Sequence, residues 1–232
     1  MKITELTKRN IIFTVPENNE GGYVHMGLIL GEKHNFIIDT GMGESNINAI
    51  RDYIGCDTKP IITIITHAHW DHIFGNSALK DGVIVSHISC RKQINDEWDT
   101  KTQNRIEKNR EFIDAQIHKC LPNVTFEGSM HFPDDGISLF HTPGHTDGCI
   151  CIYDAVGKVL YTGDSFGIWE GKAYLWTNNN HESSAHLIDV YKKCDFEICV
   201  PSHSEPQTRE VIALLEAAYI NDEQGGSKCN LT

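Results

Sequence analysis

The chain has 232 residues, an apolar content of 40% and a formal net charge of −12 from 20 basic and 32 acidic residues. This length suits one domain with a core of its own, and no apolar run reaches the length of about 18 residues that a membrane-spanning helix needs. An acidic surface repels polyanions, so the charge disfavours nucleic acid as a partner.

The first part of the chain predicts strands with helices between them. Residues 1–8 contain no apolar signal core, which favours a cytoplasmic protein. Runs rich in isoleucine and valine follow, and polar residues with Gly or Pro separate them, as is typical of strands. The expected strands cover residues 11–15, 23–30, 35–39 and 61–65, and the expected helices cover about 45–54 and 71–79.

The remainder of the chain begins with a long helical insertion. Residues 87–120 are polar, contain no Pro or Gly, and repeat apolar residues at helical spacing. We expect one domain over residues 1–222 and a flexible tail over 223–232. Eight cysteines without a CxxC pair or an export signal indicate buried thiols and no disulfides. Further strands are expected at 83–85, 124–126, 137–140, 148–153, 158–161 and 198–200, and helices near 183–192 and 206–219.

The segment HAHWDH, residues 67–72, places four metal-binding side chains within six residues. Side chains two residues apart on an extended chain point to the same side, so His67 and His69 can bind one ion together. Asp71 is a good residue to cap the N-terminus of the helix that follows. In that next turn, Asp71 and His72 can face a second ion.

Three more potential ligands, His145, Asp164 and His203, each follow a short apolar run and lie in a turn. Gly or Pro close to each of them permits a sharp exit from a strand and a close approach of the backbone to a metal. Five histidines and two aspartates in this order give one site three neutral nitrogen ligands. They give a second site two histidines and one aspartate, and they leave one carboxylate to bridge the two sites.

The order HxHxDH, His, Asp, His resembles that of the metallo-β-lactamase-fold hydrolases, a family that includes glyoxalase II, lactonases and tRNA 3′-processing nucleases. The motif Ile37–Gly41 fits the same family, and the resemblance extends over about residues 11–205. The strand and helix pattern alone is compatible with several α/β and α+β layouts. The resemblance implies an α+β fold, a four-layer αββα sandwich with the ligands on loops along one edge.

A two-metal site of this kind predicts a hydrolase. We expect two Zn²⁺ per chain, with iron or manganese as alternatives. Bridged by Asp164, the two ions can hold a water between them, whose pKa bound zinc lowers to about 7. The expected reaction is attack of that hydroxide on an ester, thioester or lactone bond of a small acyl metabolite. Asp71 can additionally accept a proton from the water.

Other residues have both a functional and a structural interpretation. Asp39 either hydrogen-bonds a ligand imidazole and fixes its tautomer, or simply forms the turn before Thr40 and Gly41. Thr66 and Thr162 can likewise support a ligand, or they can simply be β-branched residues at the ends of strands.

Substrate contacts are expected from the aromatic stretch 166–176 after Asp164 and from the insertion around 98–117. Lactonases of the family place a phenol near the first stretch, so the resemblance implies a catalytic role for Tyr174 or Tyr161. The alternative for each tyrosine is packing under a loop.

Alternative functions use the same scaffold. The name-giving β-lactamases lack a carboxylate where Asp164 stands, and flavin-linked di-iron members have an acid where His69 stands, so neither activity is expected. A mononuclear iron enzyme of the persulfide dioxygenase type would use His67, His145 and Asp164. The remaining alternative functions are a phosphodiesterase and a binding module without catalysis. The protein is expected to be a monomer or a homodimer.

Overall fold

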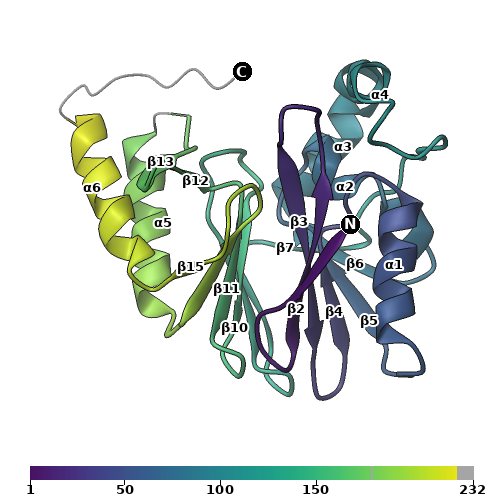
Figure 1. The fold of residues 1–232 in the computed structure, drawn as a ribbon, viewed down its shortest axis with the longest axis horizontal. Helices are drawn as coiled ribbons and strands as arrows, with labels where there is room; N and C mark the ends of the chain where they lie inside the picture. The colour runs from purple at the N-terminus through teal and green to yellow at the C-terminus, as the bar shows by residue number, and fades with distance from the viewer. Residues whose placement is uncertain (179, 224–232) are drawn as a thin grey trace.

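The computed structural model describes residues 1–178 and 180–223, which fold into two β-sheets packed face to face with helices on both outer sides (Figure 1). The first sheet has the order β1-β2-β3-β4-β5-β6-β7 and the second has the order β15-β14-β11-β10-β9-β8. The strands of the first sheet are Lys2–Glu5, Asn10–Pro16, Tyr23–Leu30, Asn35–Ile38, Ile61–Ile64, Val83–His87 and Val124–Phe126. Those of the second, from β8, are Ser129–Phe132, Ile137–His141, Ile150–Asp154, Val159–Gly163, Ile198–Pro201 (β14) and Gln207–Thr208 (β15).

Helices cover the outer face of each sheet. The helices α1 (Glu44–Ile54), α2 (Trp70–Ile73) and α3 (Ile88–Glu97) lie on the side of the first sheet, while α5 (His181–Lys193) and α6 (Val211–Glu223) cover the second. This arrangement confirms the predicted four-layer αββα sandwich. A separate hairpin, β12 (Phe166–Trp169) and β13 (Lys172–Leu175), packs against α6.

Three hydrophobic clusters explain why the central strands are apolar on both faces. Along β3, Leu28 packs against the helices of the first sheet, whereas Ile29 packs between the two sheets. Along β10, Ile152 packs between the sheets and Cys151 packs against α5 and α6. Strands with both faces buried need apolar residues at every position. The seven described cysteines are free thiols, as expected.

The helix expected at residues 71–79 is divided into α2 and a 3₁₀ turn, Asn76–Leu79. Gly75 lies between them, and a Cβ there would lie 2.3 Å from the carbonyl oxygen of Thr40, so the backbone turns where only glycine fits. The expectation that Asp71 caps this helix is wrong. His69 occupies the N-cap position, and Asp71 lies within the first turn.

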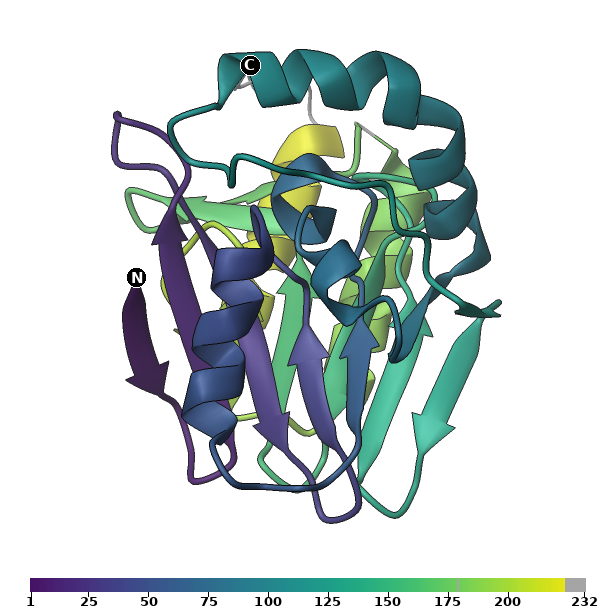
Figure 2. The same ribbon diagram turned by 90° about the vertical axis from the view of Figure 1, so that its right-hand side faces the viewer.

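The insertion at residues 87–120 is helical only in its first two thirds. It contains α3, a π-helical turn (Trp98–Thr102) and α4 (Gln103–Lys108), which run along the top edge of the first sheet in Figure 2. Residues 109–120 form turns and irregular chain instead of the expected helix. Phe112, Ile113 and Ile117 still pack against the core from this irregular segment, so their spacing reflects burial and not helix.

The C-terminal helix begins at Val211, later than expected, because Gln207 and Thr208 pair with β14 as β15. Most of the predicted tail, residues 224–232, lies outside the described residues. The single domain over 1–222 stays a prediction. None of the described helices has the length and apolarity needed to cross a membrane. The short strands β1, β8, β12, β13 and β15 were not expected from the sequence.

Candidate metal centre

All seven predicted ligands converge at one edge of the sandwich, on connections that leave strands of both sheets. His67 and His69 follow β5, and Asp71 and His72 belong to α2. The other three come from the second sheet: His145 lies between β9 and β10, Asp164 follows β11, and His203 follows β14. They form two groups whose candidate ligand atoms lie within 4.8 Å of one another.

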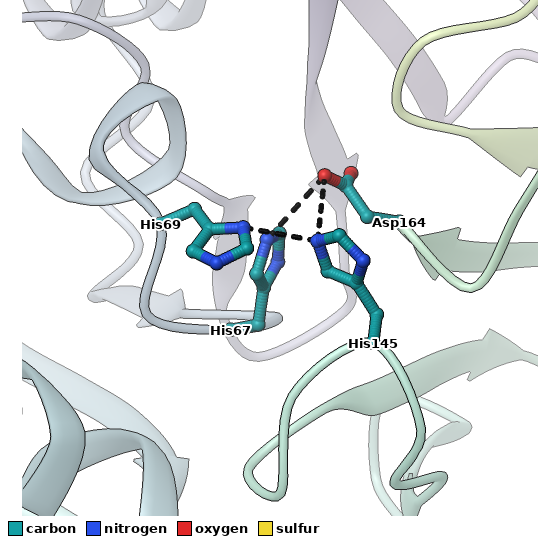
Figure 3. Close-up of side chains that lie close together, drawn as sticks. All are labelled: His67, His69, His145 and Asp164. Atoms are coloured by element: carbon teal, nitrogen blue, oxygen red, sulfur yellow. Dashed lines mark hydrogen bonds and ion pairs between the residues drawn. The ribbon is translucent and has the colours of Figure 1, made fainter. Parts of the chain in front are cut away.

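The first cluster consists of His67, His69, His145 and Asp164 (Figure 3). The Nε2 atoms of His67 and His145 lie 3.4 Å and 3.5 Å from Oδ2 of Asp164. Nε2 of His145 lies 2.9 Å from Nδ1 of His69. The two neighbouring histidines of the HAHWDH segment therefore face one point, as their spacing predicts.

The second cluster consists of Asp71, His72, Asp164 and His203. Nε2 of His72 lies 3.2 Å from Oδ2 of Asp71 and 3.3 Å from Oδ1 of Asp164. Nε2 of His203 lies 3.3 Å from Oδ2 of Asp71 and 3.2 Å from Oδ2 of Asp164. Asp164 is thus common to both clusters, and it offers a different oxygen to His67 and to His72.

Backbone geometry brings Asp164 to this point. Gly163, the residue before it, has φ 57°, and a Cβ there would lie 3.1 Å from Cβ of Thr66. A side chain at this position would be strained and crowded. Glycine therefore allows the end of β11 to approach the start of the HAHWDH segment.

The residues of both clusters fit metal ions. Among the described residues, Nε2 of His67, Nε2 of His72 and Oδ1 of Asp164 are buried without a hydrogen-bond partner. Such atoms cost free energy when they are buried unpaired. All three point into the clusters, where a divalent cation would supply the missing partner. Imidazole nitrogens and carboxylate oxygens are the ligands that zinc, iron and manganese accept.

Asp39 holds imidazoles of both clusters. Nδ1–H of His72 donates to Oδ2 of Asp39 at 2.7 Å, and the hydroxyl of Thr66 donates to the same oxygen at 2.7 Å. Nδ1–H of His67 in turn donates to the Thr66 hydroxyl at 3.1 Å. Asp39 itself has φ 58°, a conformation that Asp tolerates better than most residues. The hydrogen bonds expected of Asp39 and Thr66 to imidazoles of predicted ligands are thus present, while metal binding by these imidazoles stays a prediction.

His203 is held by residues that the sequence did not indicate. Its Nδ1–H donates to the carbonyl oxygen of Tyr23 at 2.8 Å, and Oε2 of Glu17 lies 2.9 Å from the same nitrogen. A carbonyl carries no side-chain signal, and Glu17 resembles any other charged loop residue. Thr162 has no such role, because its hydroxyl donates to the carbonyl oxygen of Val200 at 3.3 Å.

The two clusters differ in their electrostatics. Burial, reinforced by the neighbouring imidazoles, lowers the pKa of His69 to about 3 and that of His145 to about 4. Burial also acts to lower the pKa of His72 and of His203. In these two the carboxylates around them, Asp164 foremost, outweigh burial and raise the pKa well above its usual value.

Trp176, directly after β13, is the aromatic side chain that contacts both clusters. Its ring centroid lies 6.3 Å from that of His145 and 6.1 Å from that of His203. Tyr161 is wrong as a candidate for substrate contact: it is buried between the sheets, where its hydroxyl donates to Oδ1 of Asn10 at 3.1 Å. Tyr174 is half-buried, and its catalytic role stays a prediction.

Comparison with known proteins agrees with this geometry. The model of the metallo-beta-lactamase superfamily matches residues 19–203. The acyl-coenzyme A thioesterase MBLAC2 of Gallus gallus is 22% identical over 90% of this chain and 83% of its own length. A hydroxyacylglutathione hydrolase of Pelagibacter ubique is 26% identical over 64% of this chain and 54% of its own length.

Solved structures show the same fold. A metallo-beta-lactamase from Pontibacter korlensis superposes with a TM-score of 0.70, covering 95% of this chain and 99% of its own, at 19% sequence identity. At this identity, the likeness supports the architecture of the two sheets and their helices and leaves the substrate open.

Proposed function

This chain belongs to the metallo-beta-lactamase superfamily and is a metal-dependent hydrolase of ester-type bonds, and from that premise we propose that it uses two zinc ions to cleave an acyl thioester, ester or lactone of a small metabolite. The observation that carries the proposal is the shared carboxylate of Asp164. It belongs to both clusters and offers Oδ2 to His67 and Oδ1 to His72. A single-ion site would need no such sharing.

Divalent ions bound at the two clusters would supply a nucleophile by lowering the pKa of water and would polarise the scissile carbonyl. The chain's own residues provide the rest. Asp164 sets the spacing between the clusters. Asp71 directs Oδ2 toward His72 and His203, and we assign its other oxygen to accept the proton of the attacking water.

A thioester is the favoured substrate within this class. The relatives that align over 90% of the chain are named as acyl-coenzyme A thioesterases. The acyl carbonyl of a thioester, an ester and a lactone reacts in the same way with hydroxide, so the same residues serve all three. The cytoplasmic location, the exclusion of nucleic acid and membrane as partners, and the monomeric or homodimeric state remain proposals from the sequence.

The mononuclear iron alternative leaves much of the site without a role. It would use His67, His145 and Asp164, whereas His72 Nε2 is buried and unpaired in the second cluster. A ligand that is fixed by Asp39 and aimed at Asp71 and Asp164 indicates a second ion.

Metal analysis of protein purified without chelator, paired with a screen of thioesters, esters, lactones and phosphodiesters, tests the proposal. We expect two zinc ions per chain and turnover of an acyl substrate. His72→Ala should empty the second cluster and leave the first partly occupied, while His118→Ala, which removes an exposed imidazole outside both clusters, should change nothing. One iron per native chain, unchanged in His72→Ala, would overturn it.

A further inference from the structure

The hairpin of β12 and β13 has one packed face and one open face. Phe166, Ile168, Ala173 and Leu175 point inward and belong to the cluster formed with α5 and α6. The register pairs Phe166 with Leu175 and Ile168 with Ala173, so these four side chains share a face. The intervening positions must therefore lie on the opposite, outer face of the hairpin.

That outer face is aromatic. It carries Trp169 on β12 and Tyr174 on β13, and Trp176 continues it one step beyond the end of β13. Gly167 keeps the face flat, because a Cβ there would lie 2.5 Å from Cζ2 of Trp176. Trp169 is 67% exposed, and exposed apolar side chains that share one face indicate a binding site where a single one would not.

One end of this face reaches the metal centre. Trp176 contacts His145 of the first cluster and His203 of the second, so its indole borders the position where a substrate carbonyl would lie. From Trp176 to Lys172, four residues of extended chain cover roughly 13 Å. Trp169 pairs with Lys172 across the hairpin, and it marks the far end of the face.

We propose that this outer aromatic face binds the apolar acyl group of the substrate, with Trp176 beside the reacting carbonyl and Trp169 under the distal carbons. The proposal rests on the hydrolase function above and names the specificity of that site. An apolar chain fits better than a phosphate-bearing leaving group. Among the described residues the face carries one cation, Lys172, which follows Glu170 by two positions in the sequence, and the chain as a whole carries a net charge of −12.

The test is a series of straight-chain acyl thioesters, from acetyl to decanoyl, with one small neutral leaving thiol. Each methylene that is buried on the face should raise kcat/KM by about fourfold, up to the length of the face. Trp169→Ser should abolish the gain for the longest chains, a loss of at least about fivefold, through KM and not kcat. The rate with the acetyl thioester should not change. Trp176→Ala should lower the gain for every chain length.

Two variants serve as controls. Val156→Ser removes a side chain that is 65% exposed in the turn between β10 and β11, away from the metal centre, and should leave the chain-length profile intact. Tyr174→Phe keeps the ring but removes the hydroxyl with the predicted catalytic role, so it should change turnover by the same factor for every chain length. An unchanged profile in Trp169→Ser would overturn the proposal. In a second series, with the acyl group fixed and the leaving thiol lengthened, a kcat/KM that rises with thiol size and is lowered by Trp169→Ser would overturn it by assigning the face to the other side of the bond.

Binding of straight-chain carboxylates, from acetate to decanoate, separates this inference from the proposed function. Calorimetry should show affinity rising with chain length in the native protein and in Val156→Ser, and the rise should be lost in Trp169→Ser. Absence of turnover with all thioesters and esters, together with this binding pattern, would reject the hydrolase assignment while the acyl-binding face stands. Chain-length-independent binding would reject the face.

Discussion

The two metal clusters are built from the same residue types yet differ in how firmly they are held. In the second, His72 is fixed by Asp39 and His203 by the Tyr23 carbonyl. In the first, only His67 has such a partner among the described residues, through Thr66. The second is rich in carboxylates and the first in neutral imidazoles. We infer that the histidines of the second cluster are held ready to bind an ion, whereas those of the first can adjust their positions more freely.

Asp164→Asn should have the largest effect, because it changes the residue that belongs to both clusters. Asn keeps the shape but loses the charge and offers only one good oxygen ligand. We expect kcat to fall by at least ~100-fold and metal occupancy to fall in both clusters. Steady-state kinetics and metal analysis decide it: full activity with two bound metals would mean that Asp164 does not join them.

Asp39→Asn should weaken metal binding at the second cluster more than at the first. Its carboxylate bonds His72 directly but reaches His67 only through the Thr66 hydroxyl. Loss of a carboxylate that orients a metal-binding histidine costs about 10- to 100-fold in metal affinity. Competition with a chelator should show this loss at the second cluster and a smaller one at the first. Equal losses would contradict the difference we draw.

Acid should empty the clusters in sequence. The pKa of His69, about 3, and that of His145, about 4, leave these imidazoles neutral at pH values above about 5. The raised pKa values of His72 and His203 keep them protonated near neutrality when no ion is bound, so an ion must displace those protons. As pH falls from about 7 to 5, the second cluster should therefore lose its metal first. Calorimetry in buffers of different ionisation enthalpy should detect proton release from His72 and His203 on loading the second cluster and none from His69 and His145 on loading the first.

Thr66→Val should produce the smallest change, since it removes a hydroxyl and keeps the shape. His67 would lose its partner while His72 kept Asp39, so the first cluster alone should bind metal a few-fold more weakly. Thr162→Val is the matched control, because the Thr162 hydroxyl donates to the carbonyl oxygen of Val200 and bonds no imidazole of either cluster among the described residues. A larger loss in Thr162→Val than in Thr66→Val would remove the role assigned to Thr66.

The two clusters were predictable because each of their seven residues lies in a local pattern, either the HAHWDH segment or a turn after an apolar run. The residues that contact the clusters and hold their side chains in place were less predictable. Nothing local distinguishes Glu17 from other charged loop residues. Trp176 lay within an expected aromatic stretch, but its orientation toward the clusters depends on the pairing of Phe166 with Leu175. In residues 109–120, burial of Ile113 and Ile117, four residues apart, imitates helical spacing.

Each cluster takes two side chains from connections of the first sheet and two from connections of the second. An ion bound in either cluster would therefore hold the two sheets together, and its binding free energy would also oppose separation of the sheets. Such ions would lie at one edge of the sandwich only, because Asp39, Asp164 and His203 all follow the ends of strands at that edge. Removing the ions should thus let that edge open first, while the opposite edge, around Val156, stays closed.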